Sequence, residues 1–449
     1  MKNLKEWQPN PQNTINLSPP SLLALGFLSF IILGTLLLKL PISHHGELSW
    51  LNSLFTATSA VTITGLSVVN VGETFTVTGK VIIMLLIQIG GLGFMTFAIL
   101  AALSLSAKLG LKQQIMAQET IGQTSLSKVS FTIKGVLLYS LFFEAIGTVI
   151  LTIAWMEDYN FNQAFFYAAF YSVSAFNNGG FSLFPNSLMS FSGQYLITFT
   201  ISMLYIIGGI GFVVLMDIKR SKRWKGLSTN SKLILSTIAG LNIIAFILLW
   251  AIESNNPLTL APMSLGDQAL NAWFHATVPR SSGFNSLDLA QMKDASTLVT
   301  MLLMFIGGGS MSTAGGIKVG TFIIVLLSVI SFLRREDEIR VFNHAVSEKT
   351  SFKAMAVVSI TATLVFLGIF SLTLIEPNHE FIDLLFETIS AACTVGLSRG
   401  ITGELQPASL FVLMLLMFAG RLGPLTLAYL IATPKKSRLK HPTTDIQIG

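Results

Sequence analysis

The chain has 449 residues, of which 52% are hydrophobic and only 11% are charged. Soluble domains carry charges on roughly a quarter of their residues, so this composition excludes a string of soluble domains and predicts an all-α polytopic membrane protein. The net charge of +6 comes from lysines and arginines in the loops between apolar runs. The positive-inside rule explains them better than nucleic-acid binding does. A single cysteine, Cys393, excludes intrachain disulfides and a cysteine-based metal cluster.

Full-length and half-length apolar segments alternate along the chain in an order that recurs four times. We therefore expect a cytoplasmic tail at 1–18, four tandem helix–pore-loop–helix repeats at 19–106, 107–218, 219–335 and 336–432, and a cytoplasmic tail at 433–449. The expected spans are 21–40 and 80–105, 131–155 and 194–216, 233–252 and from 296, and 352–375 and 410–431. The expected half-helices, too short to cross a bilayer, are 50–58, 162–174, 266–277 and 381–391.

Each half-helix is followed by a stretch in which a glycine precedes a bulky apolar residue. One such stretch is typical of an ordinary turn. Four at corresponding places predict a filter whose backbone carbonyls replace the water shell of a potassium ion, with pseudo-fourfold symmetry round one pore. The filter residues are Thr62, Ile63, Thr64 and Gly65; Asn177, Asn178, Gly179 and Gly180; Arg280, Ser281, Ser282 and Gly283; and Cys393, Thr394, Val395 and Gly396.

The second spans carry glycine clusters that begin at Gly90, Gly208, Gly307 and Gly420, each at a similar distance after the filter glycine. Alone, such glycines indicate close helix packing. Tied to the four loops, they predict the cytoplasmic half of a pore-lining helix. They give the repeat a second, independent signature.

The second span of the third repeat is interrupted by glycines and hydroxyl residues that disfavour a helix. Irregular backbone at membrane depth is tolerated where it is buried or lines a water-filled cavity, so we expect a gate below the filter. A phosphate-binding loop is the alternative, but the run lacks the Gly-Lys-Ser/Thr spacing. The expected gate residues are Gly307, Gly308, Gly309, Ser310, Met311, Ser312, Thr313, Ala314, Gly315, Gly316 and Lys318, together with Arg421 of the fourth repeat.

Two charged residues lie within apolar spans, where a bare charge is costly. Arg421 is either a fixed cation near the pore or a structural arginine that satisfies carbonyls of the interrupted span, and both readings stay open. Glu144 is expected to be a structural partner buried between helices. His275, which we expect to cap the third half-helix, is interpreted as structural.

Charge also predicts the topology. If both tails and the linkers between repeats are cytoplasmic, most of the 28 lysines and arginines lie on that side. This gives eight spans with both termini inside. The acidic residues concentrate in the putative outer segments, where their field would attract cations.

With these motifs the chain resembles the Trk/Ktr/HKT superfamily of potassium transporters over nearly its full length. The resemblance rests on Gly65, Gly180, Gly283 and Gly396, on the interrupted span and on Arg421. The start of the first repeat near Ser21 is similar to the shorter Ktr membrane subunit. The resemblance implies a homodimer and a separate cytosolic regulatory ring with nucleotide-binding domains. Gly65, where sodium-carrying plant relatives have serine, favours potassium.

The leading hypothesis is therefore potassium uptake across the cell membrane, passive or coupled to another ion by symport, with sodium dependence left open. K⁺ would be the transported ion, and no organic cofactor or nucleic acid is expected; membrane lipid is an expected partner. The alternative is a secondary transporter of a small anionic organic solute held by Arg421. An enzyme is not expected, because the sequence shows no nucleophile–base or metal set.

Overall fold

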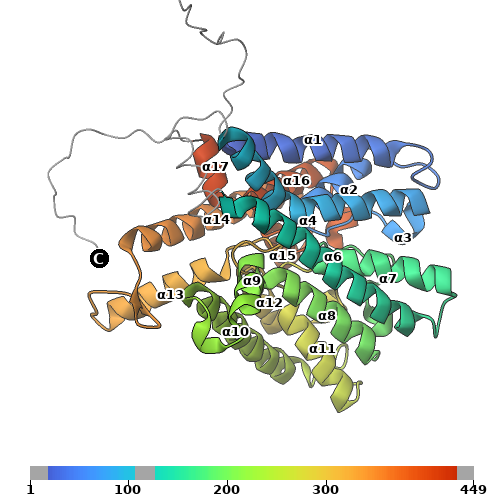
Figure 1. The fold of residues 1–449 in the computed structure, drawn as a ribbon. Coiled ribbons are helices and arrows are strands. Elements are labelled where there is room, and N and C mark those ends of the chain that lie inside the picture. Colours follow the sequence, from blue (N-terminus) through green and yellow to red (C-terminus); the bar gives the residue numbers. More distant parts are fainter. Residues whose placement is uncertain (1–18, 107–126, 432–449) are drawn as a thin grey trace, which may run out of the picture.

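The computed structural model describes residues 19–106 and 127–431, so the two predicted tails and part of the first linker lie outside it. We call residues 19–106, 127–218, 219–335 and 336–431 units one to four. Helices dominate the described residues and run roughly parallel through the molecule (Figure 1). A hairpin of β1 (Arg340–Val341) and β2 (His344–Ala345) connects the last helix of unit three to unit four.

Units one and two both begin with a long helix, followed by a short one. In unit one the elements are α1 (Pro19–Lys39), α2 (Trp50–Thr62), α3 (Val71–Thr74) and α4 (Val77–Ser106). In unit two they are α6 (Ser127–Trp155), α7 (Phe161–Phe176), η1 (Met189–Phe191), α8 (Tyr195–Ile210) and α9 (Phe212–Ser221).

Units three and four show the same order of long and short helices. Unit three contains η2 (Trp224–Gly226), α10 (Thr229–Glu253), α11 (Leu265–Thr277), η3 (Leu289–Gln291), α12 (Asp294–Phe305) and α13 (Val319–Leu333). Unit four contains α14 (Glu348–Ile375), α15 (Phe381–Ala392), η4 (Ile401–Glu404), α16 (Pro407–Leu422) and α17 (Pro424–Ile431).

By length and composition, three helices of the described chain could each cross a membrane: the apolar part of α6, α10 and α14. Two bent pairs raise this number to five if each pair counts as one span, and shorter apolar helices lie in α1, α4, α12 and α13. The chain is thus a multi-pass helical membrane protein.

The two bends correct the sequence analysis, which expected an interruption only in the third unit. Helices α8 and α9 meet at 92° and α16 and α17 at 98°. Gly211 lies at the first bend with φ 109°, and Gly423 lies at the second with φ 82° and is followed by Pro424. A left-handed glycine ends a helix easily, and proline cannot donate the next helical hydrogen bond.

The first two half-helices extend further than predicted, whereas the third ends at Thr277 as expected and the fourth one residue later than expected. Helix α2 continues to Thr62, whose hydroxyl donates to the carbonyl of Thr58 at 2.7 Å, and α7 continues to Phe176. The expected boundary fell where the hydroxyl and small residues begin, but those residues remain helical because they are buried against neighbouring helices.

Each short helix packs against the first long helix of its own unit and also touches the preceding unit. Helix α4 contacts α7, α8 contacts α11, and α12 contacts α15. The series closes on itself, because α16 of unit four contacts α2 of unit one. The four short helices therefore surround a common centre.

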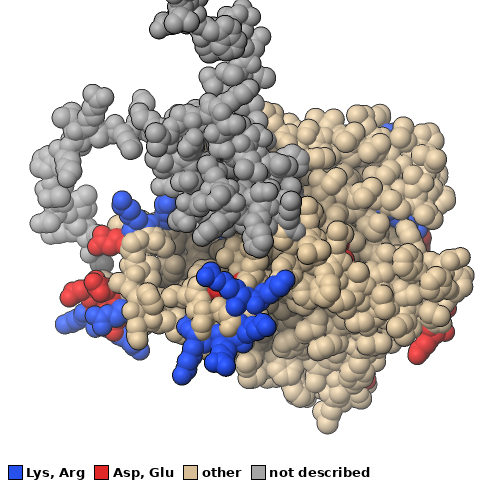
Figure 2. All heavy atoms as spheres, in the orientation of Figure 1, with Lys and Arg blue, Asp and Glu red and all other residues tan. Residues whose placement is uncertain are grey.

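Charge is unevenly distributed over the surface. Figure 2 shows lysine and arginine gathered over the α9–α10 connection, where Lys219, Arg220, Lys222, Arg223 and Lys225 are exposed. A second, mixed group of charges lies at the α13–α14 connection.

Candidate functional site: a ring of glycines above an interrupted helix

The four short helices present their carboxyl ends to the loops that follow them. Three of these helices are capped at the far end by a side chain: Ser49, Asn160 and Ser264 each accept a hydrogen bond from the first turn. The carboxyl end of a helix carries a partial negative charge. Four such ends near one centre favour a cation there.

The four loops share one backbone conformation. In each, the glycine and the residue two positions before it have positive φ. These residues are Ile63 and Gly65 (55° and 92°), Asn178 and Gly180 (58° and 68°), Ser281 and Gly283 (77° and 72°), and Thr394 and Gly396 (49° and 88°). Because alternating backbone hands turn successive peptide groups to the same side, this conformation suits a row of carbonyls directed at a ligand.

The four glycines lie against one another in a closed ring. A Cβ atom added to Gly65 would lie 3.0 Å from the Cα of Gly180, and one added to Gly180 would lie 2.8 Å from the Cα of Gly283. From Gly283 the distance to the Cα of Gly396 would be 3.4 Å, and from Gly396 back to Gly65 it would be 3.0 Å. Glycine is required at these positions both by the positive φ and by the close approach.

Backbone hydrogen bonds fasten each loop to its short helix. The N–H of Thr64 donates to the carbonyl of Ser59 at 2.8 Å, and Val395 donates to Ser390 in the same way at 2.8 Å. The hydroxyls of these two serines also accept from Gly65 and Gly396, both at 3.0 Å. A hydroxyl residue stands six positions before all four glycines, a signal that the sequence analysis missed: Ser59, Ser174, Thr277 and Ser390.

The glycine clusters of the second spans lie at the carboxyl ends of the short helices. A side chain at Gly90 would collide with the carbonyl of Val61, and one at Gly208 with that of Phe176. Gly420 is placed in the same way against Ala392. In unit three, by contrast, Gly307 lies against Gly315 of its own interrupted span. Close packing, which the sequence analysis treated as the lesser reading, is thus the direct role of these glycines.

On the outer side of the ring is a vestibule of about 250 Å³. All four ring glycines and side chains such as Ser67, Ser182, Asn285 and Ser398 line it, and its lining contains no aspartate or glutamate. The expected acidic mouth therefore does not form the wall itself. Glu73 and Glu404 are exposed close by, so their field stays a prediction.

The segment between α12 and α13, which we call the interrupted segment (306–318), folds back on itself. Ile306 and Ile317 pair as a parallel bridge, and Gly307 donates to the carbonyl of Ile317 at 2.9 Å. Lys318 turns its ammonium onto the carbonyl of Ala314 at 2.5 Å. The ends of the segment are therefore adjacent, and its middle projects as a compact loop.

This loop is bonded to the bend of unit two. Gly309 donates to the carbonyl of Gly209 at 2.8 Å, and the N–H of Phe212 donates to the carbonyl of Met311 at 3.0 Å. Because the helix breaks at Gly211, the N–H of Phe212 has no acceptor within α8 and bonds the loop instead. The loop cannot move without losing these bonds.

The same loop is hydrogen-bonded to the loops that contain the ring glycines. The amide of Asn178 donates to the hydroxyl of Thr313 at 2.6 Å, and the N–H of Gly315 donates to the hydroxyl of Ser281 at 2.8 Å. Ser281 in turn donates to the carbonyl of Thr394 at 2.6 Å. Residues of the glycine loops of units two, three and four thereby contact the interrupted segment, directly or through one hydroxyl.

Arg421 joins the interrupted segment to unit one. Its two terminal nitrogens donate to the carbonyls of Thr313 and Gly90, both at 2.7 Å, and the side chain is buried. These are bonds of the kind that the structural reading of Arg421 expected, and a second role as a fixed cation near the pore stays a prediction. Its Nε has no hydrogen-bond partner among the described residues, and neither do Asn177 Oδ1 and Thr394 Oγ1.

Glu144 is a buried structural partner, as expected. Its carboxylate accepts from Ser140 at 2.6 Å and from the amide of Asn177 at 3.0 Å, which ties a filter residue to α6. His275 is also structural, but it lies in the last turn of α11 and the C-cap residue is Val278. Its Nε2 accepts from the backbone N–H groups of Ser286 and Leu287.

Arg280 and Cys393 carry their side chains away from the ring. Both are buried, and the guanidinium of Arg280 donates to the carbonyl of Ile238 on α10 at 3.4 Å. That their backbone carbonyls face a ligand at the ring stays a prediction. Among the described residues, no group of three or more His, Cys, Asp or Glu side chains could hold a metal ion.

Comparison with known proteins places this geometry in a family. Residues 23–439 match the family model TrkH, described as a cation transport protein. The chain is 43% identical to Ktr system potassium uptake protein B of Bacillus subtilis, over 97% of this chain and 98% of that protein. It is 34% identical to potassium/sodium uptake protein NtpJ of Enterococcus hirae, over 96% and 98%.

A solved structure shares the fold. The crystal structure of the potassium transporter TrkH from Vibrio parahaemolyticus superposes with a TM-score of 0.75 at 20% sequence identity. The match covers 94% of this chain and 87% of that one.

Proposed function

We propose that this chain, which belongs to the TrkH family of cation transport proteins, is a potassium uptake subunit of the Ktr type. The relatives it matches are ion transporters and not enzymes. The observation that carries the proposal is the closed ring of Gly65, Gly180, Gly283 and Gly396, with its shared backbone conformation. Such a ring is what a four-loop carbonyl filter for K⁺ requires.

Under this proposal the four units are tandem repeats round one pore. The cyclic contacts of α2, α7, α11 and α15 with the preceding units support the pseudo-fourfold arrangement. Counting α1, α4 and the α12–α13 pair as spans gives eight crossings. The exposed basic residues at the α9–α10 connection support a cytoplasmic position for that end of the molecule, with both termini inside.

The interrupted segment is the proposed gate. It lies directly below filter residues Asn178 and Ser281, and its bonds to them and to Arg421 describe a closed arrangement. The polar atoms left without partners on Asn177, Thr394 and Arg421 support a hydrated space between the filter and the gate. Opening would exchange the gate's hydrogen bonds for bonds to water.

A cytosolic ring with nucleotide-binding domains is the proposed regulator, and a homodimer is the proposed assembly. The relatives' printed name, Ktr system, supports a membrane subunit that works with other components. The printed words potassium/sodium of another relative keep sodium dependence within the proposal. The exposed basic side chains from Lys219 to Lys225 offer a cytoplasmic surface for an acidic partner or for anionic lipid.

The organic-solute alternative is weakened by the state of Arg421. Both of its terminal nitrogens are already bonded to backbone carbonyls, so it has little capacity left to hold a carboxylate. The test is uptake by liposomes that contain the purified chain, with and without the cytosolic partner. Potassium uptake that exceeds uptake of small carboxylates supports the proposal; carboxylate uptake without potassium uptake would contradict it.

A further inference from the structure

Beyond each ring glycine the chain makes the same tight turn. The residue two positions after the glycine uses its side chain to bond the backbone two residues later. Ser67 donates to Val69 at 2.6 Å, Ser182 to Phe184 at 3.0 Å, Asn285 to Leu287 at 3.0 Å, and Ser398 accepts from Gly400 at 2.9 Å. We call the segment from the second to the sixth residue after each ring glycine its outgoing arm. An arm and its glycine are continuous backbone, so displacing one displaces the other.

In three units a buried side chain of the short helix holds the outgoing arm of its own loop. The hydroxyl of Tyr171 contacts Ser182 and accepts from the N–H of Leu183 at 3.1 Å. The Nε2 of His275 accepts from the N–H of Leu287 at 3.1 Å. Glu387 does the same for the arm of unit four. The three residue types differ, and His275 stands one residue nearer its glycine than Tyr171 and Glu387 do, so sequence similarity between the units does not reveal the shared role.

Unit one differs at this position. Thr56 stands nine residues before Gly65, as Tyr171 and Glu387 do before their own ring glycines, but its hydroxyl donates to the carbonyl of Asn52 within α2 at 2.8 Å. Holding the arm is therefore not required for the fold of a short helix. It is a property of particular side chains.

Glu387 is the charged member of the set and is fully buried. Its carboxylate accepts from the hydroxyl of Ser398 and, with both oxygens at 3.1 Å, from the hydroxyl of Thr402. The carboxylate thus grips the arm at two points, on either side of Gly400.

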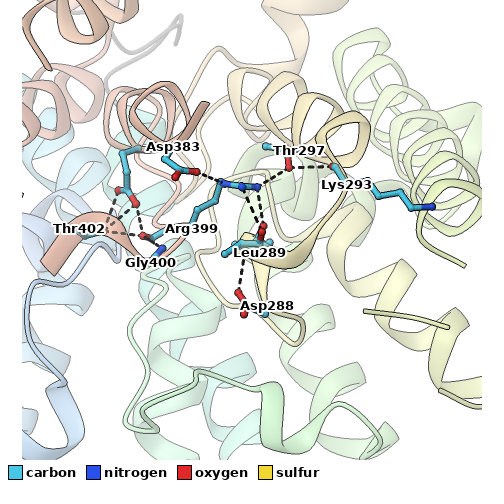
Figure 3. Close-up of polar contacts among 11 residues, drawn as sticks. Asp288, Leu289, Lys293, Thr297, Asp383, Arg399, Gly400 and Thr402 are labelled. Atoms are coloured by element: carbon cyan, nitrogen blue, oxygen red, sulfur yellow. Dashed lines mark hydrogen bonds and ion pairs between the residues drawn. The ribbon is translucent and has the colours of Figure 1, made fainter. Parts of the chain in front are cut away.

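Arg399 lies between Ser398 and Thr402 in the sequence, and its side chain bonds Asp383 and unit three. Its guanidinium donates to Asp383 at 2.6 Å, to Thr297 at 3.0 Å and to the carbonyl of Leu289 at 3.1 Å (Figure 3). Asp383 belongs to α15, whereas Thr297 and Leu289 belong to unit three. The guanidinium therefore fixes the arm to unit three, and its charge is balanced by Asp383 and not by Glu387.

We propose that Glu387 is a positioning residue for ion selection: it holds the outgoing arm of unit four and thereby keeps Gly396 in the ring against Gly65 and Gly283. The inference rests on the proposed function, since it concerns the selectivity of the same filter. It assigns the selectivity of the ring partly to a residue that does not contact the ion.

The test compares Glu387→Gln, Glu387→Ala and Ser398→Ala in proteoliposomes, with Glu376→Gln as the matched control. Glu376 is also a buried carboxylate of unit four, but it bonds Gln406 and Ser409 at the start of α16. We expect Glu387→Ala to lower the K⁺/Na⁺ permeability ratio about tenfold. Glu387→Gln and Ser398→Ala, which each keep part of the grip, should lower it two- to threefold, and Glu376→Gln should leave it unchanged.

Thermal unfolding measured beside flux separates positioning from a merely structural role, because a structural role lowers the midpoint without changing the ratio. Unchanged ratios in the Glu387 and Ser398 variants would overturn the inference. If Glu387→Ala does not fold, the other two variants still decide. If the parent protein itself shows no preference for K⁺, the proposed function fails, and not this inference alone.

Discussion

The ring of glycines and the interrupted segment lie next to each other but are built on opposite principles. The ring uses the same backbone conformation four times, with glycine fixed by positive φ and by contact with its neighbours. The interrupted segment occurs in unit three, and its bonds go to different groups in units two and four: Gly209, Phe212, Asn178 and Arg421. A symmetric part suits a ligand on an axis, and an asymmetric part suits a switch that one partner can move.

The glycine clusters of the second spans also differ between unit three and the other units. In units one, two and four they lie against the carboxyl ends of short helices, at Val61, Phe176 and Ala392. In unit three Gly307 lies against Gly315 instead. The proposed gate therefore occupies a position that serves helix packing in the other three units.

The largest expected effect comes from removing the proposed gate. Deleting Ser310 to Gly315 should raise K⁺ flux without the cytosolic partner by about one to two orders of magnitude, if the closed state is favoured by a few kcal/mol. The deletion is sterically feasible because Gly307 already lies 3.1 Å, Cβ position to Cα, from Gly316. The measurement is initial uptake into liposomes per folded protein. Flux no faster than the parent's, in a folded variant, would show that this segment is not the gate.

The next largest effect is expected from a substitution in the ring of glycines. Gly65→Ser should lower the K⁺/Na⁺ permeability ratio about tenfold, because a Cβ at φ 92° costs about 1–2 kcal/mol and would lie 2.7 Å from the carbonyl of Gly179. Gly46→Ser is the matched control: it also has positive φ, but its Cβ would meet nothing within 4 Å. An unchanged ratio in Gly65→Ser would remove unit one from the filter.

A smaller effect is expected from Arg421→Ala, which removes two buried charge-assisted hydrogen bonds that hold the gate to units one and four. Partner-independent flux should rise severalfold, while Arg421→Lys, which keeps the charge but not the two-carbonyl geometry, should rise less. Folded yield in detergent is measured in parallel. Loss of folded protein with no gain in flux would assign Arg421 to stability alone.

The smallest effect concerns one neutral contact between filter and gate. Thr313→Val removes the hydrogen bond from Asn178 and a longer one, at 3.3 Å, to the carbonyl of Phe176, and should raise basal flux about twofold, since one neutral bond contributes roughly 0.5–1.5 kcal/mol. The K⁺/Na⁺ ratio should fall little, because the ring glycines are untouched. A large fall in the ratio with no rise in flux would mean that this contact supports the filter rather than the closed gate.

The sequence predicted the parts of this molecule that recur. Four glycines at similar distances before four glycine clusters were enough to anticipate the loops at Gly65, Gly180, Gly283 and Gly396, while composition predicted the helical class and the interrupted span. The sequence did not predict in the same way which residues are buried. The helical residues up to Thr62 look like loop residues in sequence, because hydroxyl and small side chains favour turns unless neighbouring helices cover them.

Contacts between units were also beyond reach. Asn178 and Thr313 are bonded although 135 residues separate them, and no periodic pattern predicts such a pair. The bends at Gly211 and Gly423 were missed because each is a single glycine among many that only allow close helix packing. The grip of Glu387 was missed because the corresponding residues of the other units have different chemistry.

The most direct test of the account is the K⁺/Na⁺ permeability ratio of the Ser310–Gly315 deletion variant, measured in the same liposomes as the parent and Gly65→Ser. The account assigns selection to the ring and control of flow to the interrupted segment. It predicts that the deletion raises flux while the ratio stays within about twofold of the parent's, and that the ratio falls about tenfold in Gly65→Ser. A deletion variant that conducts freely but has lost its preference for K⁺ would contradict it.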